Sequence, residues 1–288
     1  MRVGMTLEKR FPPDIRVVKE ARALLTAGHE VHLLACAEAE KGSLNPADEN
    51  LDGVLVRRIP PAYWQLSAGA LRCNTLRRLL TSEDRYWFPH VMRFAQDFNL
   101  NALHVHDLPL VGTAVLVGVR FGIPVIADLH ENMPAAYRIR PTEFHGIRKL
   151  REAIFYNYYL WRRNERRTLP LCSGILVVVQ EAAERLYDYG IEGGKIILVS
   201  NTEDETTFPL HSPDPGIEKQ YQGMFVASYI GGFGPDRGLD TAIRAIPIAA
   251  REIPNLHLVI VGGQRDRQIN PLIRLIFQLG VEKRVEVW

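Results

Sequence analysis

Short apolar runs alternate with longer segments of helical periodicity, and this alternation constrains the fold more than any other feature. The runs that we interpret as strands are residues 2–5, 31–35, 54–59, 102–105, 124–127, 174–179 and 196–199. The segments that the pattern predicts as helices are residues 14–27, 89–98, 111–121, 146–168 and 181–189. Strands that alternate with helices form a parallel sheet with helices on both faces. The sequence therefore predicts an α/β, doubly wound fold.

A polar, proline-containing segment interrupts the alternation at residues 202–222. We interpret this segment as a linker between an N-terminal domain, residues 1–201, and a second α/β unit, residues 223–288. The second unit has only three predicted strands and two predicted helices, so its sheet edges are uncovered and its core is thin. We therefore expect the second domain to be incomplete and the natural chain to continue beyond Trp288.

The composition bounds the class of protein. Hydrophobic residues make up 47% of the 288 residues and charged residues 24%, as in ordinary globular proteins. The net charge of +2 is too small to argue for a nucleic-acid partner. The three cysteines, at positions 36, 73 and 172, offer neither metal-ligand spacing nor a disulfide framework. No apolar run approaches the roughly 20 residues that span a bilayer, and no signal-peptide core precedes the first strand. We therefore expect a cytoplasmic protein.

A glycine-rich loop follows the predicted strand at residues 225–230. It contains Gly231, Gly232 and Gly234, and a helix is predicted to begin at about Gly238. Glycines let a ligand approach the backbone, and the start of a helix offers unpaired N–H groups and a positive dipole end to an anion. Arg237 stands directly before this start, where a guanidinium can grip a diphosphate. The loop therefore predicts a phosphate-binding site, although a simple tight turn is the alternative.

This loop resembles the donor-diphosphate loop of family 4 retaining glycosyltransferases, which have the GT-B fold of two Rossmann-like domains. The family's loop has a Gly-Arg pair, then Lys-Gly and a helix. Here Gly231-Gly232 and Arg237-Gly238 occupy those places, so arginine replaces the family's lysine and Gly232 replaces its arginine. The stretch from Leu258 to Gly263 also matches the family. The resemblance implies that the donor-binding residues are Gly231, Gly232, Arg237, Gly238 and Gly263.

Titratable residues follow two of the predicted strands of the first domain. His106-Asp107 ends one strand, and Asp128-Leu-His-Glu131 ends the next. In open parallel sheets, ligands bind beyond the carboxyl ends of the strands. The resemblance implies that His130 lies near the anomeric centre, and that His106 and Asp107 line the acceptor pocket. Asp107 could instead cap the following helix.

Two further residues complete the predicted site. Glu131 is a candidate for acceptor recognition or acid/base chemistry, or else a charge at a helix start. Asp14 is placed to cap the first helix, which makes Arg16 a residue of its first turn. The resemblance implies that Arg16 faces the interdomain cleft on the acceptor side, although a solvated surface charge is the alternative. No Gly-x-Gly-x-x-Gly follows the first strand, which weighs against a dinucleotide oxidoreductase.

The segment from Arg148 to Arg167 is both basic and aromatic. It has seven basic and two acidic residues, interleaved with five aromatic ones. Such a helix can lie on an anionic membrane surface, which would place the protein at the inner face of the membrane. Alternatively, a buried stripe faces the core while the arginines are solvated. The residues of that stripe are Ile147, Leu150, Ile154, Tyr158 and Trp161.

The resemblance implies a specific function. The first domain would bind a glycan, lipid-linked or small-molecule acceptor, and the second a nucleotide-diphospho-sugar. The sugar would be transferred with retention of anomeric configuration, as expected in polysaccharide biosynthesis. The diphosphate would leave against Arg237 and the helix start. We expect no cofactor and no metal. The alternative is a non-catalytic protein that binds sugar or nucleotide without a complete donor site.

Overall fold

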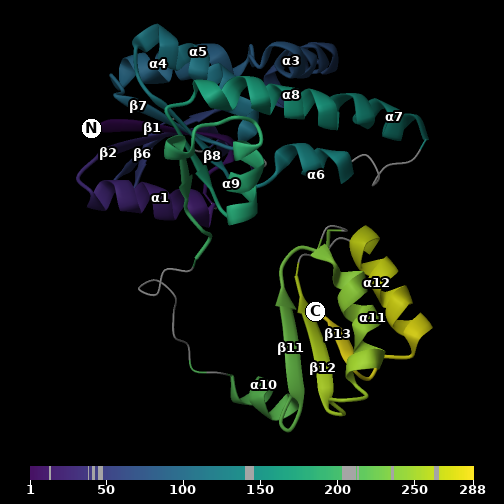
Figure 1. Ribbon diagram of the computed structural model, residues 1–288. Coiled ribbons are helices and arrows are strands. Elements are labelled where there is room, and N and C mark those ends of the chain that lie inside the picture. Colours follow the sequence, from purple (N-terminus) through teal and green to yellow (C-terminus); the bar gives the residue numbers. More distant parts are fainter. Residues whose placement is uncertain are drawn as a thin grey trace. The chain divides into compact units, whose positions relative to one another are not determined.

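The computed structural model describes residues 1–12, 14–37, 39–40, 43–44, 48–139, 146–202, 212, 214–234, 237–262 and 266–288. The chain divides into two compact units, which we describe one at a time (Figure 1). Unit 1 is Met1–Glu205 and unit 2 is Thr206–Trp288.

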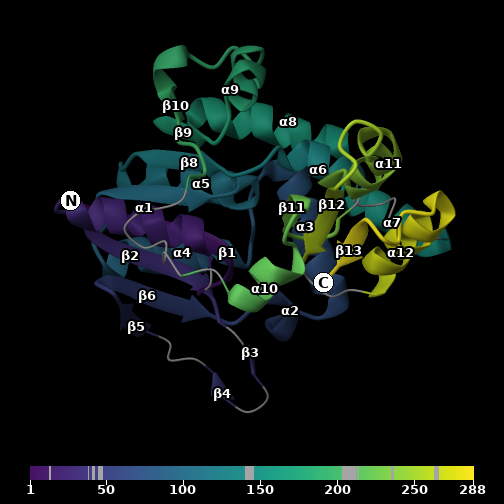
Figure 2. The same ribbon diagram turned by 90° about the horizontal axis from the view of Figure 1, so that it is seen from below.

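Unit 1 is built on an eight-stranded sheet in the order β10-β9-β8-β7-β1-β2-β6-β5. Its strands are β1 (Arg2–Arg10), β2 (Glu30–Cys36), β5 (Asp48–Leu51), β6 (Val54–Ile59), β7 (Ala102–His106), β8 (Val125–Leu129), β9 (Gly174–Val177) and β10 (Ile196–Leu198). Every pairing is parallel except that of β5 with β6. Figure 2 shows this order, from β5 and β6 through β2 and β1 to β9 and β10. The α/β prediction of a parallel sheet is confirmed. A short antiparallel pair, β3 (Ala39–Glu40) and β4 (Ser43–Leu44), lies outside this sheet.

Helices cover both faces of this sheet (Figure 1). They are α1 (Ile15–Thr26), α2 (Ala62–Gln65), α3 (Ala68–Thr81), α4 (Trp87–Asp97), α5 (Val111–Phe121), α6 (Met133–Ile139), α7 (Gly146–Phe155), α8 (Tyr158–Thr168) and α9 (Gln180–Tyr187). Successive side chains of a strand point to opposite faces. On β2, Leu33 accordingly packs in one cluster with Val17 of α1, while Leu34 packs in another with Phe94 of α4. Both residues are fully buried.

The chain reverses its direction of travel across the sheet at β1. From β1 it runs outward to β2 and β6, and it then returns to β7 on the opposite side of β1. Such a reversal leaves a crevice at the carboxyl ends of the two strands, where open α/β sheets bind ligands. β1 continues to Arg10, beyond the predicted end at Met5, so Glu8 and Lys9 lie at this edge.

Unit 2 contains a three-stranded parallel sheet in the order β11-β12-β13. Its elements are α10 (Pro215–Gln220), β11 (Phe225–Ile230), α11 (Leu239–Ala249), β12 (Leu256–Val261), α12 (Asp266–Leu279) and β13 (Val285–Val287). The core joins Ile243 and Ile246 of α11 to Ile260 of β12 and Leu275 of α12. The helix α10 lies inside the segment that the sequence analysis interprets as a linker.

The predicted helix over residues 146–168 is two helices, α7 and α8. The side chain of Asn157 accepts a hydrogen bond from the backbone N–H of Leu160 at 3.1 Å and so begins a new helix. The predicted buried stripe is wrong for α7, because Leu150 is 70% exposed and Ile154 is 52% exposed. It holds for Trp161 of α8, which is 2% exposed, whereas the side chain of Ile147 lies outside the described residues.

Among the described residues, no helix combines the length and the apolar character that crossing a bilayer requires.

Candidate functional site

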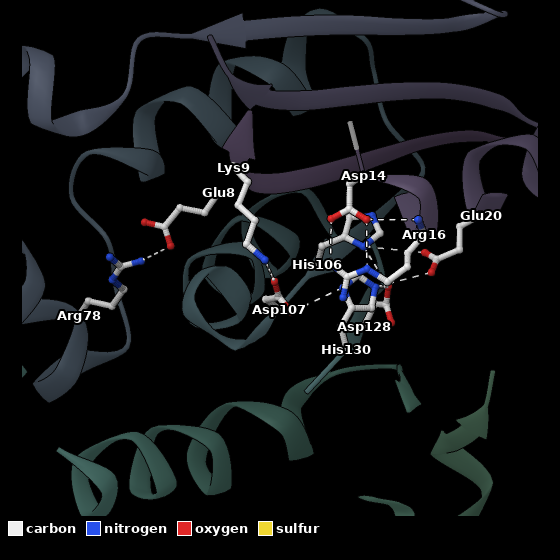
Figure 3. Close-up of polar contacts among 10 residues, drawn as sticks. All are labelled: Glu8, Lys9, Asp14, Arg16, Glu20, Arg78, His106, Asp107, Asp128 and His130. Atoms are coloured by element: carbon white, nitrogen blue, oxygen red, sulfur yellow. Dashed lines mark hydrogen bonds and ion pairs between the residues drawn. The ribbon is translucent and has the colours of Figure 1, made fainter. Parts of the chain in front are cut away.

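Five ionisable side chains meet at the edge where β7 and β8 end, and we call them the histidine cluster. They are Glu20, His104, His106, Asp128 and His130. His104 and His106 are two residues apart on β7, so their rings point to the same face of the sheet. The two rings are stacked, with their centroids 4.7 Å apart. Asp128 of β8 stands opposite His106 in the parallel register, and His130 follows at the end of β8. Figure 3 shows His106, Asp128, His130 and Glu20 turned toward one another.

One carboxylate oxygen organises the cluster. Oδ2 of Asp128 lies 2.9 Å from Nδ1 of His106, 2.7 Å from Nε2 of His130 and 3.5 Å from Nε2 of His104. Glu20 reaches in from α1, with Oε2 at 3.3 Å from Nε2 of His104 and Oε1 at 3.7 Å from Nε2 of His130. The three histidines and Asp128 are buried, and Glu20 is half-buried.

The electrostatics of the cluster follow from this arrangement. Burial alone would raise the pKa of Asp128, but the three imidazoles around its carboxylate hold that pKa well below its usual range. Burial opposes the charging of His130, yet the nearby carboxylates of Asp128 and Glu20 outweigh it and raise the pKa of His130 to about 9. Burial lowers the pKa of His106, and its contact with Asp128 only partly compensates. The cluster therefore favours an ion pair between Asp128 and His130.

Asp107 approaches His130 from the opposite side. Its Oδ1 lies 3.6 Å from Nδ1 of His130, and its Oδ2 accepts a hydrogen bond from Nζ of Lys9 at 2.8 Å. Its backbone is at φ 63° and ψ 153°, a conformation that is uncommon for a residue with a side chain. The side chain makes no capping hydrogen bond to the helical turn that follows, so the capping alternative is wrong. His106 and Asp107 are both buried.

Arg16 and Glu131 lie at the margin of the site. Asp14 caps α1, as predicted, by accepting from the backbone N–H of Arg16 at 3.2 Å. The same carboxylate also accepts from Nε and Nη2 of Arg16, at 3.1 and 2.8 Å. This pairing outweighs the effect of burial and lowers the pKa of Asp14. The side chain of Glu131 is exposed, and among the described contacts none joins it to the histidine cluster.

The glycine-rich loop of unit 2 connects β11 to α11. Gly238 adopts φ 67° at the N-terminus of α11, a left-handed conformation that glycine adopts without strain. Tyr229 donates a hydrogen bond from its hydroxyl to the carbonyl oxygen of Gly232 at 2.7 Å, which folds the loop back on β11. The side chain of Arg237, directly before α11, is exposed. Gly263 lies outside the described residues.

Close packing fixes part of this loop. A Cβ atom on Gly262 would lie 1.9 Å from the carbonyl oxygen of Gly231. The residue directly after β12 must therefore be glycine for the backbone to approach Gly231 this closely. A Cβ atom on Gly232 would meet nothing within 4 Å among the described atoms. Gly232, which stands where the resemblance expects arginine, therefore has room for a side chain.

Four residues that the structure brings to the site had no predicted role: Lys9, Glu20, His104 and Asp128. The signal for His104 was its spacing of two from His106 on a strand, which places both rings on one face. Glu20 could have been found because it lies four residues after Arg16 on a helix, which places both side chains on one face.

The chain matches known proteins across most of its length. A family model described as glycosyl transferase 4-like domain matches residues 14–202. The glycogen synthases of two Mycobacterium tuberculosis strains are 23% identical in an alignment of 259 residues, and the match covers 83% of this chain. That match covers 55% of each relative, so the chain spans about half the length of the curated relatives that it matches.

Solved structures share the fold at low identity. A sucrose-phosphate synthase from Thermosynechococcus elongatus has a TM-score of 0.65 at 13% identity, over 100% of this chain and 70% of its own. A trehalose-phosphate synthase from Burkholderia vietnamiensis has a TM-score of 0.61 at 12% identity, and the match covers 99% of this chain and 71% of the synthase. Anabaena HepE, solved in complex with UDP and glucose, has a TM-score of 0.58 at 14% identity, and the match covers 100% of this chain and 68% of HepE. These likenesses show the GT-B fold.

Proposed function

This chain belongs to the family with a glycosyl transferase 4-like domain, and we propose that it is part of a glycosyltransferase acting on a nucleotide-diphospho-sugar. In this proposal, unit 1 binds a glycan, lipid-linked or small-molecule acceptor and unit 2 binds the donor. The sugar is transferred with retention of configuration. The proposal concerns the whole protein, because the matched relatives are longer than this chain.

The donor side is supported by the loop between β11 and α11. Eleven residues of α11 align their peptide dipoles toward Gly238, where the positive end attracts a diphosphate. The exposed guanidinium of Arg237 can add two parallel hydrogen bonds to the same group. Anabaena HepE, which shares the fold, was solved with UDP-glucose. A nucleotide-diphospho-sugar is therefore the ligand chemistry that suits this loop best.

The observation that carries the proposal on the acceptor side is the placement of His130. Its Nε2 lies 2.7 Å from Oδ2 of Asp128 and its Nδ1 lies 3.6 Å from Oδ1 of Asp107, directly after the end of β8. The carboxylates around the imidazole favour its protonated, positively charged form. A positive charge at the end of this strand suits a departing phosphate, where negative charge develops during transfer.

The test is donor binding and turnover by the full-length protein with a panel of nucleotide sugars. Thermal shift and calorimetry report binding, and release of nucleoside diphosphate reports turnover. We expect Arg237→Ala to lose on the order of 2–4 kcal/mol of transition-state stabilisation. The matched control is Arg244→Ala, an exposed arginine further along α11. Normal turnover by Arg237→Ala would contradict the assignment of this loop as the diphosphate-binding site. Binding without release would favour the non-catalytic alternative.

We also propose that α7 and α8 rest on an anionic membrane surface. The exposed apolar side chains of Leu150, Ile154 and Tyr159 support this, because they do not serve the core of unit 1. Exposed basic residues accompany them at positions 149, 162, 163, 166 and 167. Co-sedimentation with phosphatidylglycerol vesicles should exceed that with phosphatidylcholine vesicles, and Leu150→Ser with Ile154→Ser should abolish the difference. Equal sedimentation with both lipids would contradict the proposal.

A further inference from the structure

Four members of the histidine cluster direct donor atoms toward a common point. Glu20, His104, His106 and Asp128 each contribute one oxygen or nitrogen, and these four atoms all lie within 4.8 Å of one another. They come from three separate elements: α1, β7 and β8. Two imidazole nitrogens and two carboxylate oxygens form a donor set that suits a divalent transition metal.

Four of the six separations between the donor atoms are close to those around a small tetrahedral ion. Oε2 of Glu20 lies 3.3 Å from Nε2 of His104 and 3.8 Å from Nδ1 of His106. Oδ2 of Asp128 lies 3.5 Å and 2.9 Å from the same two nitrogens. Ligands at about 2.0–2.1 Å from a tetrahedral zinc ion are about 3.3–3.4 Å apart, so the four separations scatter around the value that zinc requires.

Hydrogen bonding within the cluster leaves two of these donor atoms without a partner. Oε2 of Glu20 and Nε2 of His104 are buried, and among the described residues neither has a partner with hydrogen-bond geometry. His104 is more than nine-tenths buried, and its Nε2 faces the centre of the group. A buried polar atom without a partner is costly, and a metal ion would satisfy both atoms at once.

Charge also favours a cation at this point. Glu20 and Asp128 bring two carboxylates into a largely buried site. His130 already faces Asp128, and a divalent ion would in addition neutralise Glu20, whose side chain is 19% exposed. Nitrogen donors favour zinc over magnesium or calcium, which prefer oxygen ligands alone.

We propose that Glu20, His104, His106 and Asp128 form a structural zinc site that ties α1 to the ends of β7 and β8. The ion has no part in the chemistry of the proposed sugar transfer. Its role is to fix the strand ends that carry Asp107 and His130. His130, at 2.7 Å from Oδ2 of Asp128, is then the outer partner that orients a metal-bound carboxylate.

The first experiment measures metal binding by the full 288-residue chain after stripping with a chelator. We expect one equivalent of Zn²⁺ to survive dialysis, and Co²⁺ to give the intense visible bands of a four-coordinate ion. X-ray absorption should show nitrogen and oxygen ligands at about 2.0–2.1 Å and no sulfur. A chain that retains neither ion overturns the proposal, as does a sulfur-ligated one.

Variants then assign the ligands. Glu20→Gln and His104→Gln should each lose the bound ion while keeping the circular dichroism of the unchanged chain. The matched control is His32→Gln, because His32 is a buried histidine of the same sheet that pairs with a carboxylate, Glu30, at 2.8 Å. Full retention of zinc by both ligand variants overturns the assignment. If these variants fail to fold, the absorption spectrum of the unchanged chain still decides between zinc and no zinc.

Discussion

Nε2 of His130 and Oδ2 of Asp128 lie 2.7 Å apart at the carboxyl end of β8, in a pairing from which water is largely excluded. Both groups favour the charged state, since the pKa of the aspartate is depressed and that of the histidine is raised to about 9. A buried ion pair contributes little net stability, but removing one partner leaves an uncompensated charge.

We therefore predict that Asp128→Asn lowers the free energy of unfolding by about 3 kcal/mol. The control is Asp97→Asn, since Asp97 pairs with Arg57 at 2.6 Å but is half-exposed, and it should cost less than about 1 kcal/mol. Urea unfolding followed by tryptophan fluorescence is suitable, because three of the four tryptophans lie in unit 1. Equal losses for the two variants would contradict the argument from burial.

Gly262 and Gly232 provide a matched pair of loop variants. Gly262→Ala should destabilise unit 2 by about 1–3 kcal/mol and weaken donor binding, because its Cβ would overlap the backbone oxygen of Gly231. Gly232→Ala should leave the stability of unit 2 unchanged, since the same atom would meet nothing within 4 Å among the described residues. Thermal unfolding and UDP calorimetry measure the two effects. A destabilised Gly232→Ala would show that the loop is packed differently.

Replacing Asp107 with glycine should separate the effect on stability from the effect on activity. Asp107→Gly removes the side chain that faces Lys9 and His130, but it also relieves a left-handed φ. We expect a free energy of unfolding within about 1 kcal/mol of the unchanged chain, together with a clear loss of sugar transfer. Asp107→Ala keeps the strain and should be less stable than Asp107→Gly. The reverse order would rule out strain at this residue.

The pH dependence of the free energy of unfolding should report the protonation of His32. Burial lowers its pKa below the ordinary 6.5, and the hydrogen bond to Glu30 only partly compensates. The folded state therefore favours neutral His32. The associated stability is present above about pH 6.5 and is lost as the pH falls through the lowered value. His32→Gln should reduce the loss in unfolding free energy between neutral pH and about pH 5. An unchanged slope would assign the acid sensitivity to other groups.

The alternation of strands and helices was sufficient to predict the sheet of unit 1, because each strand buries both faces and so reads as an apolar run. The end of β1 could not be predicted, since Glu8 and Lys9 break the apolar pattern while β1 continues to Arg10. The break between α7 and α8 was missed because helical periodicity persists across Asn157. Local pattern does not reveal that a side chain caps a new helix.

Only some residues of the candidate site could be predicted from the sequence. His106, Asp107 and His130 could be identified because they end predicted strands. Glu20 could not, because it lies more than eighty residues before His104 and meets it only when α1 packs beside β7. The proposed zinc ligands were not predicted either, because Glu20 and Asp128 are far along the chain from His104 and His106.

The single oxygen that three imidazole rings share has a genetic consequence. Because Oδ2 of Asp128 is within 3.5 Å of a nitrogen of each ring, no histidine can be replaced without altering the surroundings of the other two. Single substitutions there will not sum, and double-mutant cycles should show large coupling energies. We therefore expect substitutions at Asp128 and the three histidines to be tolerated in combination more readily than one at a time.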